Sequence, residues 1–256
     1  MSTPTDLACR LENRSWSYRV DPFPHVVADR VFLPRAYDEL AEAFERRLRG
    51  SPGPEQFSRN MPGYDASGLT LTPRTTGALA FFISRGWHDL IAAIFQVEVT
   101  GHLSGGLHHH DRGSADGTIH NDLNPGWFAE YQTDDGIIVS DPSLCDYRTG
   151  HTFAPGITAC ETVRAVAVLF YLDNPEWECG SGGVTGLYAS GSDCLHSPAA
   201  IVPPHNNSLL AFECTPHSHH AFLSNRRQPR NSIIVWLHRA KSTVIAQWGH
   251  QSIIHW

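Results

Sequence analysis

The chain has 256 residues, a formal net charge of -7 and a charged fraction of 18%. A hydrophobic fraction of 41% is typical of a globular protein and excludes wholesale disorder or a fibrous repeat, while the acidic balance argues against nucleic acid or an anionic membrane as the main partner. Histidine is the outlier with 16 residues, and this excess needs a chemical explanation.

The N-terminal third is predicted to be mainly helical. Residues 22–33 are expected to form a strand and a turn. A helical period follows, because four apolar side chains fall on one face: Tyr37, Leu40, Phe44 and Leu48. Gly50 and the SPGP run end this helix. Residues 51–73 are rich in Gly, Pro and Ser and are expected to form a loop, and residues 75–95 a second, more apolar helical region that packs on the rest of the fold.

From residue 97 the pattern changes to about ten short β-like runs separated by turn residues, VEVTGHLS, GTIHNDL, GIIVS, RAVAVLFYL, GVTGLYA, AAIV, SLLAFE, HHAFL, NSIIVWLH and STVIAQW. This spacing favours a sandwich or barrel over alternating βαβ units. We therefore expect a mainly β fold with N-terminal helices in one domain, residues 1–256. Within it, residues 1–98 form a helical support region and residues 99–256 a β-barrel core. The long polar interruption at 133–163 has the length of a lid or binding loop.

Location and partners follow from absences in the sequence. The N-terminus lacks the apolar core of a signal peptide, and no stretch approaches the roughly 18 apolar residues of a membrane span. Six scattered cysteines without a CxxC pair indicate reduced thiols and a cytoplasmic protein. We expect no nucleic-acid or membrane partner, and the oligomeric state stays open.

A metal site is indicated by residues 117–124, GTIHNDLN. In a strand His120 and Asp122 point to the same side, which makes two adjacent ligands for a first-row metal. A third ligand must come from elsewhere, and three histidines compete for that position in the segment ECTPHSHHAF: His217, His219 and His220. Two histidines and one carboxylate with open positions form the facial triad of non-haem Fe(II) oxygenases.

Arg230 opens the strongly apolar run RNSIIVW. A buried guanidinium needs an anion, because an unpaired charge is costly there. A carboxylate of a small acid, bound through both oxygens, would satisfy it. Ser232 shares the face of Arg230 two positions on, so its hydroxyl could add a hydrogen bond.

These features together resemble a known family. HxD, about a hundred residues, then a histidine followed ten positions later by Arg-x-Ser resembles the Fe(II)/2-oxoglutarate-dependent oxygenases, in particular the prolyl-4-hydroxylase-like branch. The similarity covers roughly residues 100–240. Its further elements are Gly106-Leu107-His108 ahead of the HxD, Arg164 followed by VLFYLD, Trp177 and Gly182-Gly183, and NSLLAF leading into Ser218-His219-His220-Ala221.

The resemblance implies a double-stranded β-helix of the jelly-roll or cupin type and the cofactors Fe(II), 2-oxoglutarate and O2. In that branch the second ligand histidine stands two positions after a serine, which selects His220 as the partner of His120 and Asp122. Arg230 would anchor the C5 carboxylate of 2-oxoglutarate, with Ser232, Tyr171 and His110 as further contacts. Tyr171 is equally readable as a core aromatic, and His110 as a solvated loop residue. Arg164 is expected to be structural, and the second HxD at 109–111 falls before the strand that matches the family's HxD.

The resemblance also implies hydroxylation of an unactivated C–H bond with release of succinate and CO2. Because Asp122 is present, hydroxylation is favoured over radical halogenation, in which a small residue replaces the carboxylate; desaturation, epoxidation and cyclisation stay open. We expect a small-molecule substrate, an amino acid or a specialised-metabolite precursor, with residues 51–74 and 133–163 closing over it. Three aromatic residues either line that pocket or pack in the core: Trp127, Phe128 and Tyr131.

Three alternatives stay open. A peptide or protein side-chain hydroxylase would need an open groove. A non-catalytic β-barrel that binds a metal or small ligand is disfavoured by the intact triad and Arg230. A zinc hydrolase is compatible with a histidine-rich site, but it leaves Arg230 without a purpose and offers no evident general base.

Overall fold

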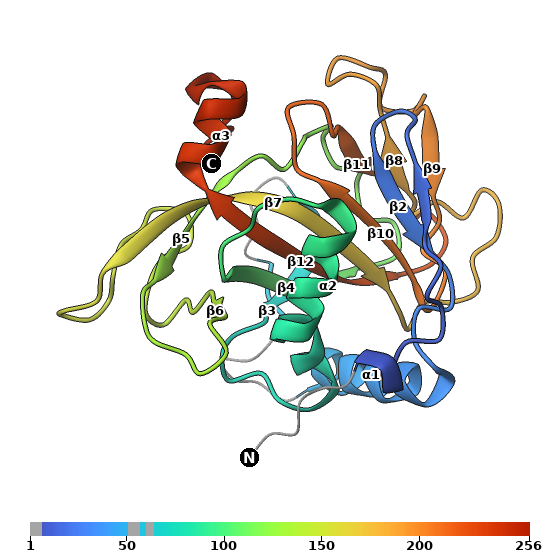
Figure 1. The fold of residues 1–256 in the computed structure, drawn as a ribbon. Coiled ribbons are helices and arrows are strands. Elements are labelled where there is room, and N and C mark those ends of the chain that lie inside the picture. Colours follow the sequence, from blue (N-terminus) through green and yellow to red (C-terminus); the bar gives the residue numbers. More distant parts are fainter. Residues whose placement is uncertain (1–6, 51–56, 60–63) are drawn as a thin grey trace.

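Two β-sheets form the molecule, with the two N-terminal helices on one side (Figure 1), and the computed structural model describes residues 7–50, 57–59 and 64–256. The larger sheet has the strand order β1-β2-β10-β7-β12-β4-β3, with β5 paired to β7 and β6 to β4. Its strands are β1 (Ser17–Arg19), β2 (His25–Ala28), β3 (Ser67–Thr70), β4 (His102–His110), β5 (Pro125–Ala129), β6 (Ile138–Val139), β7 (Ala159–Tyr171), β10 (Ser208–Glu213) and β12 (Arg230–Ala240). The smaller sheet has the order β11-β8-β9, formed by β8 (Thr185–Leu187), β9 (Ala200–Val202) and β11 (His220–Phe222).

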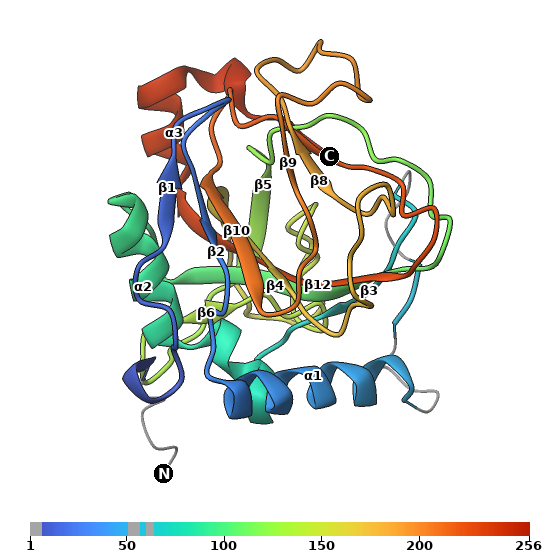
Figure 2. The ribbon, with the colours of Figure 1, turned by 90° about the vertical axis from the view of Figure 1, so that its right-hand side faces the viewer.

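The helices are α1 (Pro34–Leu48), α2 (Arg85–Phe95) and α3 (Lys241–Trp248), with 3-10 turns η1 (Leu7–Cys9), η2 (Gly77–Ile83) and η3 (His250–Ser252). Figure 2 shows the smaller sheet standing opposite the central strands of the larger one. The mainly β architecture with N-terminal helices agrees with the predicted fold class. Strands β1, β2 and β3 of the first 98 residues also join the larger sheet.

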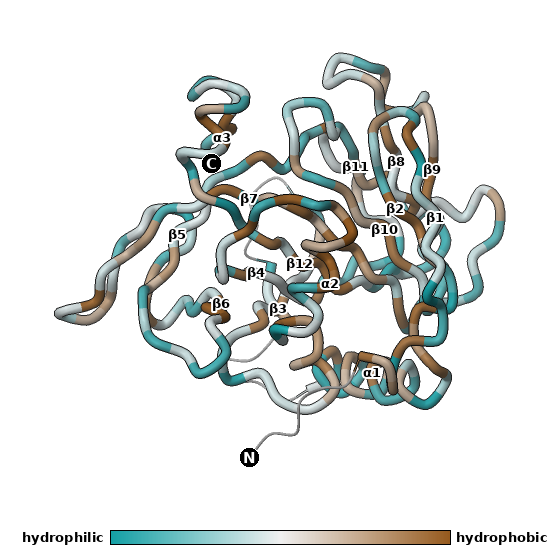
Figure 3. The backbone as a smooth tube through the Cα atoms, in the orientation of Figure 1, coloured by the Kyte–Doolittle hydropathy of each residue, from teal (hydrophilic) through white to brown (hydrophobic). Residues whose placement is uncertain are grey.

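Strand β7 separates two apolar cores because its side chains alternate between the faces of the sheet. Val168 and Phe170 belong to the core that α1, η2 and α2 complete. Leu169 and Tyr171 belong to the second core, between the two sheets. Figure 3 shows apolar residues concentrated along α2 and the central strands. A strand buried on both faces explains why residues 163–172 form a nearly continuous apolar run.

The two predicted N-terminal helical regions are present, and the second is divided. Helix α1 begins with Pro34 at its first turn and buries Leu40 and Phe44. Residues 77–95 split into η2 and α2 at Ser84, whose extended backbone and side chain cap the second helix by accepting a hydrogen bond from the backbone N–H of Trp87. Of the expected 51–73 loop, residues 51–56 and 60–63 lie outside the described part of the chain, and β3 occupies residues 67–70.

The expectation that no stretch approaches the length and apolar composition of a membrane span is wrong. The 19 residues Gly77–Phe95 have the length and apolar composition of a spanning helix. The segment is nonetheless interrupted at Ser84, and three of its largest apolar side chains are buried in the helix-side core: Phe82, Trp87 and Ile91. The apolar composition is therefore accounted for by packing against the sheet.

A second correction concerns residues 242–248, predicted as a strand and found as α3. The β-branched run favours a strand locally, but the last strand pair of β12 is Ala240 with Thr162. In the helix Val244 is fully buried, and one turn later the ring of Trp248 lies 4.9 Å from the Arg239 guanidinium. Tertiary packing on one helical face therefore overrides the local propensity.

The cysteines agree with the prediction of reduced thiols. All six lie among the described residues, and the five apart from Cys9 are free. Two of them, Cys145 and Cys214, are buried. Burial raises the pKa of the Cys214 thiol well above its usual value, so it stays protonated and behaves as a small apolar side chain.

A buried histidine joins β12 to its neighbours. His238 is fully buried. Its Nε2 lies 3.1 Å from the hydroxyl of Ser104 and 3.2 Å from that of Tyr147, and its Nδ1 lies 3.0 Å from the Thr162 hydroxyl. Burial, followed by the nearby Arg164 charge, lowers the pKa of His238 well below its ordinary value. The imidazole is therefore neutral at physiological pH.

This burial predicts a pH dependence of stability. Below its ordinary pKa of about 6.5 the histidine binds a proton only in the unfolded chain, so acidification favours unfolding. Between pH 7.5 and 5.5, His238→Gln should reduce the loss in the free energy of unfolding of the metal-free protein by about 1.4 kcal/mol. Urea denaturation at both pH values measures it. His196→Gln, whose side chain is 65% exposed, is the control, and an unchanged pH slope in the His238 variant would contradict the assignment.

Candidate active site

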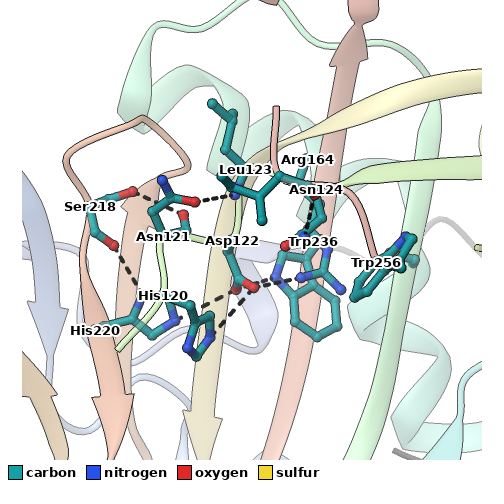
Figure 4. A network of polar contacts seen from close by, with 12 residues as sticks. His120, Asn121, Asp122, Leu123, Asn124, Arg164, Ser218, His220, Trp236 and Trp256 are labelled. Atoms are coloured by element: carbon teal, nitrogen blue, oxygen red, sulfur yellow. Dashed lines mark hydrogen bonds and ion pairs between the residues drawn. The ribbon is translucent and has the colours of Figure 1, made fainter. Parts of the chain in front are cut away.

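Three predicted metal-binding side chains converge on one point (Figure 4). His120 and Asp122 stand between β4 and β5, and His220 begins β11. One ligand atom from each lies within 4.8 Å of the others. The two histidines are held by paired backbone hydrogen bonds, 3.0 Å from the His120 N–H to the His220 carbonyl and 2.8 Å in the opposite direction. Asp122 lies 3.7 Å from the His120 Nε2 and 3.6 Å from the His220 Nε2.

The HxD segment is not the strand that was expected. Only His120 forms a β-bridge, and Asp122 has a φ of +60°. The Asn121 side chain accepts a hydrogen bond of 3.1 Å from the backbone N–H of Leu123, so the chain turns after the histidine. Aspartate tolerates the left-handed conformation better than most residues. A turn therefore brings the carboxylate to the imidazoles, where strand alternation had been expected to do so.

Backbone carbonyls orient both imidazoles. The Nδ1 of His120 lies 2.8 Å from the carbonyl of Thr118, and the Nδ1 of His220 lies 3.0 Å from the carbonyl of Ser218. A carbonyl can only accept, so the proton resides on Nδ1 and the lone pair on Nε2, toward Asp122. Burial, and then the charge of His120, lower the pKa of His220 to about 3. The neutral His220 thus presents its Nε2 lone pair, the form that binds a metal, and the Nε2 of His120 faces the same carboxylate.

Two donors hold the Asp122 carboxylate. An Arg164 guanidinium N–H donates to Oδ1 at 2.6 Å, and the Trp236 indole N–H donates to Oδ2 at 2.8 Å. Burial alone would raise the pKa of Asp122, but the Arg164 charge and the two imidazoles outweigh it and hold that pKa well below its usual value. The carboxylate is therefore ionised. Arg164, expected to be structural, acts on the site by fixing this carboxylate.

The competing histidines lie elsewhere. His217 is exposed, and the nearby ring of His219 faces Gly191. His109 and Asp111, the second HxD, contact each other at 3.2 Å. A second group with metal-ligand chemistry exists among the described residues, formed by His102, Glu130 and Cys160. In it the His102 ring already bonds the Glu130 carboxylate at 2.7 Å.

Arg230 is buried without a counter-ion among the described residues. It is 1% exposed, and its Nη2 donates to the Thr185 hydroxyl at 3.1 Å. Its Nε and Nη1 have no hydrogen-bond partner in the described part of the chain. The rings of Tyr171 and Phe222 flank it, with centroids 5.2 and 5.1 Å from the guanidinium carbon. Such a charge is stable only with an anion bound against it.

The other predicted contacts of the diacid surround Arg230. Ser232 is fully buried, its hydroxyl unpaired among the described residues, opposite Tyr171 in the sheet. The Tyr171 hydroxyl lies 2.8 Å from the hydroxyl of Thr185, the residue that also accepts from Arg230. Of the two interpretations of Tyr171, a core aromatic and a site residue, the contacts support both.

His110 is not a solvated loop histidine. It ends β4, fully buried, and stacks on Phe222 with ring centroids 3.8 Å apart. Its nitrogens lie 3.1 Å from the Tyr64 hydroxyl and 3.1 Å from the Asp65 carbonyl. Burial, and then the Arg230 charge, lower its pKa to about 2. A neutral imidazole thus forms part of the wall near Arg230.

A cavity of about 460 Å³ joins the triad to the surroundings of Arg230. Its lining includes residues that sequence analysis did not single out for the site: Tyr64, Arg148, Thr185, Trp236 and Trp256. Tyr64 comes from the 51–74 region and Arg148 from the 133–163 region, the two segments predicted to close over the substrate. Trp127, Phe128 and Tyr131 are absent from this lining, and Phe128 packs on His102 and His238, which supports the core interpretation.

His108 is a further residue of this cavity to which the sequence analysis gave no role. It lies two positions from His110, opposite Ser232 in the sheet, and its Nδ1 is buried without a partner among the described residues. Burial, and then the Arg230 charge, lower its pKa to about 3. The run Leu107–His110 with alternating faces was a usable signal, because His108 and His110 share one face of a strand that ends opposite Arg230.

Comparison with known proteins gives a family and a fold. Residues 143–238 match the 2OG-Fe(II) oxygenase superfamily, and no curated protein matches. Among solved structures, a Pseudomonas putida prolyl-4-hydroxylase has a TM-score of 0.55 at 16% identity, covering 84% of this chain and 92% of its own. A Trichoplax adhaerens prolyl hydroxylase, in complex with a hypoxia inducible factor oxygen degradation domain peptide fragment, has 0.51 at 14%, covering 87% and 86%. A viral collagen prolyl hydroxylase from Paramecium Bursaria Chlorella virus-1, solved with 2OG, has 0.50 at 13%, covering 84% and 96%.

The match over residues 143–238 supports the predicted 2OG-Fe(II) oxygenase family, and the chain has the fold of the prolyl-4-hydroxylases, which confirms the predicted jelly-roll core. These similarities support the predicted 2-oxoglutarate-dependent hydroxylase with Fe(II), 2-oxoglutarate and O2 as its cofactors. The matched range contains His220 and Arg230, whereas His120 and Asp122 precede it. Their roles therefore rest on the geometry described above.

The buried Asp122–Arg164 pair predicts a stability effect. Arg164→Met leaves a buried carboxylate without its counter-charge and should lower the free energy of unfolding of the metal-free protein by about 3 to 5 kcal/mol. Urea denaturation at pH 7.5 measures it. Arg35→Met, which removes a pair whose arginine is 92% exposed, should cost no more than about 0.5 kcal/mol. Adding Asp122→Asn to Arg164→Met should recover stability, and a further loss would contradict the pairing.

Proposed function

We propose that the enzyme hydroxylates an unactivated C–H bond of a small molecule, with His120, Asp122 and His220 holding Fe(II) and Arg230 holding the far carboxylate of 2-oxoglutarate. One observation carries this proposal. The three-ligand cluster lines a cavity whose wall also includes Thr185 and Phe222, and these two residues contact the buried Arg230 guanidinium with its two unpaired nitrogens.

The donor set suits Fe(II). Two neutral imidazole nitrogens and one ionised carboxylate oxygen supply three ligands and a single negative charge, which leaves positions for a cosubstrate. The Nδ1 contacts of both histidines and the two donors to Asp122 fix the ligand atoms before any metal binds.

The buried polar atoms around Arg230 suit a carboxylate. Its Nε and Nη1 and the Ser232 hydroxyl have no partner among the described residues, and all three come from the start of β12. A carboxylate of 2-oxoglutarate would accept from the guanidinium through both oxygens and from the serine. The other proposed contacts of the cosubstrate stay Ser232, Tyr171 and His110. Tyr171 would contact the carboxylate directly or through the Thr185 hydroxyl.

The protein's own part in the reaction is orientation and exclusion of water. When bound, Fe(II) with 2-oxoglutarate and O2 supplies the oxidising chemistry, with succinate and CO2 as co-products. Arg164 and Trp236 keep the Asp122 carboxylate ionised and fixed. Apolar side chains from the facing sheets line the same cavity and limit its water content: Leu169, Phe222 and Ile234.

The size of the cavity supports a small substrate. Its roughly 460 Å³ must hold the cosubstrate as well as the substrate. An amino acid or a specialised-metabolite precursor fits the remaining space. Peptide or protein side chains are the alternative, because the Trichoplax relative of similar fold was solved with a peptide fragment. Succinate release with peptides and none with free small molecules would decide for that alternative. The free cysteines support a reducing compartment such as the cytoplasm.

The ligand assignment predicts a spectroscopic difference between neighbouring histidines. Anaerobic titration with Fe(II) and 2-oxoglutarate should produce a metal-to-ligand charge-transfer band in the visible range. His220→Ala should abolish the band because it removes a ligand, and His219→Ala should leave it intact. A band that persists in the His220 variant would contradict the choice of His220.

The anchor assignment predicts a separate effect on the cosubstrate. Arg230→Gln removes one side of a buried charge pair and should raise the apparent dissociation constant of 2-oxoglutarate by about a hundredfold. The same anaerobic titration measures it, with Fe(II) held in excess. Arg227→Gln, an exposed arginine of the preceding loop, is the control. An unchanged affinity in the Arg230 variant would show that another group holds the diacid.

A further inference from the structure

Aromatic rings and guanidinium groups alternate along one wall of the cavity. The Arg164 guanidinium carbon lies 3.8 Å from the centroid of Trp236 and 5.0 Å from that of Trp256. The Arg148 guanidinium carbon lies 4.9 Å from the centroid of Trp256. The stack therefore runs from the Asp122 carboxylate, which Arg164 and Trp236 both contact, out to the exposed Arg148 (Figure 4 shows its inner part).

Three hydrogen bonds hold Trp256 in this stack. The backbone N–H of Ile254 donates to the Leu123 carbonyl at 3.0 Å, and the Asn124 side chain donates to the Ile254 carbonyl at 2.7 Å. The Trp256 indole N–H donates to the Pro125 carbonyl at 2.9 Å. All three partners directly follow Asp122 in the chain. The segment after α3 is thus fastened to the loop that presents the carboxylate, and it forms part of the cavity wall.

Arg148 is the outermost cation of the stack and is available to a ligand. Among the described residues its guanidinium makes no hydrogen bond or ion pair with another side chain. It stacks on the ring of Trp256. The nearest acid in the sequence is Asp146, whose pKa is lowered first by hydrogen bonds from Thr149 and last by the Arg148 charge. The carboxylate of Asp146 is occupied within its own turn, where the Thr149 hydroxyl and backbone N–H donate to Oδ1 at 2.9 and 2.8 Å.

The charge of the cavity differs from that of the whole chain. Two arginines and one acid, Asp122, are among its lining residues, although the chain carries a net charge of -7. Asp122 compensates Arg164, and the two carboxylates of 2-oxoglutarate would face Arg230 and the metal. Arg148 is left without a compensating anion, at the mouth and beside an aromatic face.

We propose that the substrate carries a carboxylate that binds Arg148, while its adjoining carbon skeleton lies against Trp256 and extends toward the triad. This inference rests on the proposed function and names the substrate class of the same site. A single planar guanidinium matches one carboxylate through two hydrogen bonds. The distance between Arg148 and the triad would then select which C–H bond is hydroxylated. Arg148 and Trp256 therefore determine specificity.

The test uses matched probes on the Fe(II)- and 2-oxoglutarate-loaded enzyme. Free amino acids and other metabolite carboxylates are compared with their methyl esters and primary amides. Binding is read anaerobically as a shift of the charge-transfer band, and turnover as succinate release. Acids should shift the band and release succinate, and their esters and amides should do so only at concentrations about tenfold higher or more. Succinate release with compounds that lack a carboxylate would overturn the proposal. Esters that are as effective as the acids would overturn it as well.

The variants separate substrate binding from chemistry. Arg148→Gln should raise KM for the acid about tenfold or more, with kcat changed less than about twofold. Arg148→Lys should restore part of the affinity, and Arg227→Gln should leave KM unchanged. A KM unaffected by Arg148→Gln overturns the inference. Absence of the charge-transfer band in the unaltered enzyme would instead overturn the proposed function, and the inference with it.

Discussion

The site depends on one buried interaction, the Asp122 carboxylate held between the Arg164 guanidinium and the Trp236 indole. Burial opposes ionisation of a carboxyl group. The adjacent Arg164 charge, together with the hydrogen bonds from Arg164 and Trp236, reverses that preference. The same two side chains belong to β7 and β12, the central strands of the larger sheet. The charged metal ligand Asp122 is thereby fixed by two central strands, while its own backbone lies in a loop.

The two buried guanidiniums near the site have opposite local environments. Arg164 is saturated by a carboxylate of the chain itself, and its charge serves to hold a metal ligand. Arg230 is equally buried but lacks such a partner among the described residues, so its charge is available to a diacid. Neutral histidines keep these two arginine environments distinct. Burial lowers the pKa values of His108 and His220 to about 3, so neither side chain adds a competing positive charge.

The sequence predicted the residue pairs that depend on local spacing, and missed those created by tertiary contact. His120, Asp122, His220 and Arg230 stand at spacings that a motif reports. Strand alternation gave the right outcome for Asp122 by the wrong route, since a left-handed turn brings it to the imidazoles. Trp256 reaches the cavity through hydrogen bonds to residues more than a hundred positions earlier, and no local pattern carries that information. Residues 242–248 likewise became helical through packing that their β-branched composition does not report.

The central claim is that three side chains share one metal while Arg230 binds the diacid on that metal. Anomalous X-ray diffraction at the iron edge, from anaerobic crystals grown with Fe(II) and 2-oxoglutarate, tests it most directly. The account predicts one iron about 2.2 Å from Nε2 of both histidines and an oxygen of Asp122, with the distal carboxylate of the diacid against Arg230. Iron bound instead at the His102–Glu130–Cys160 group, or a fourth protein ligand closing the triad, would contradict it.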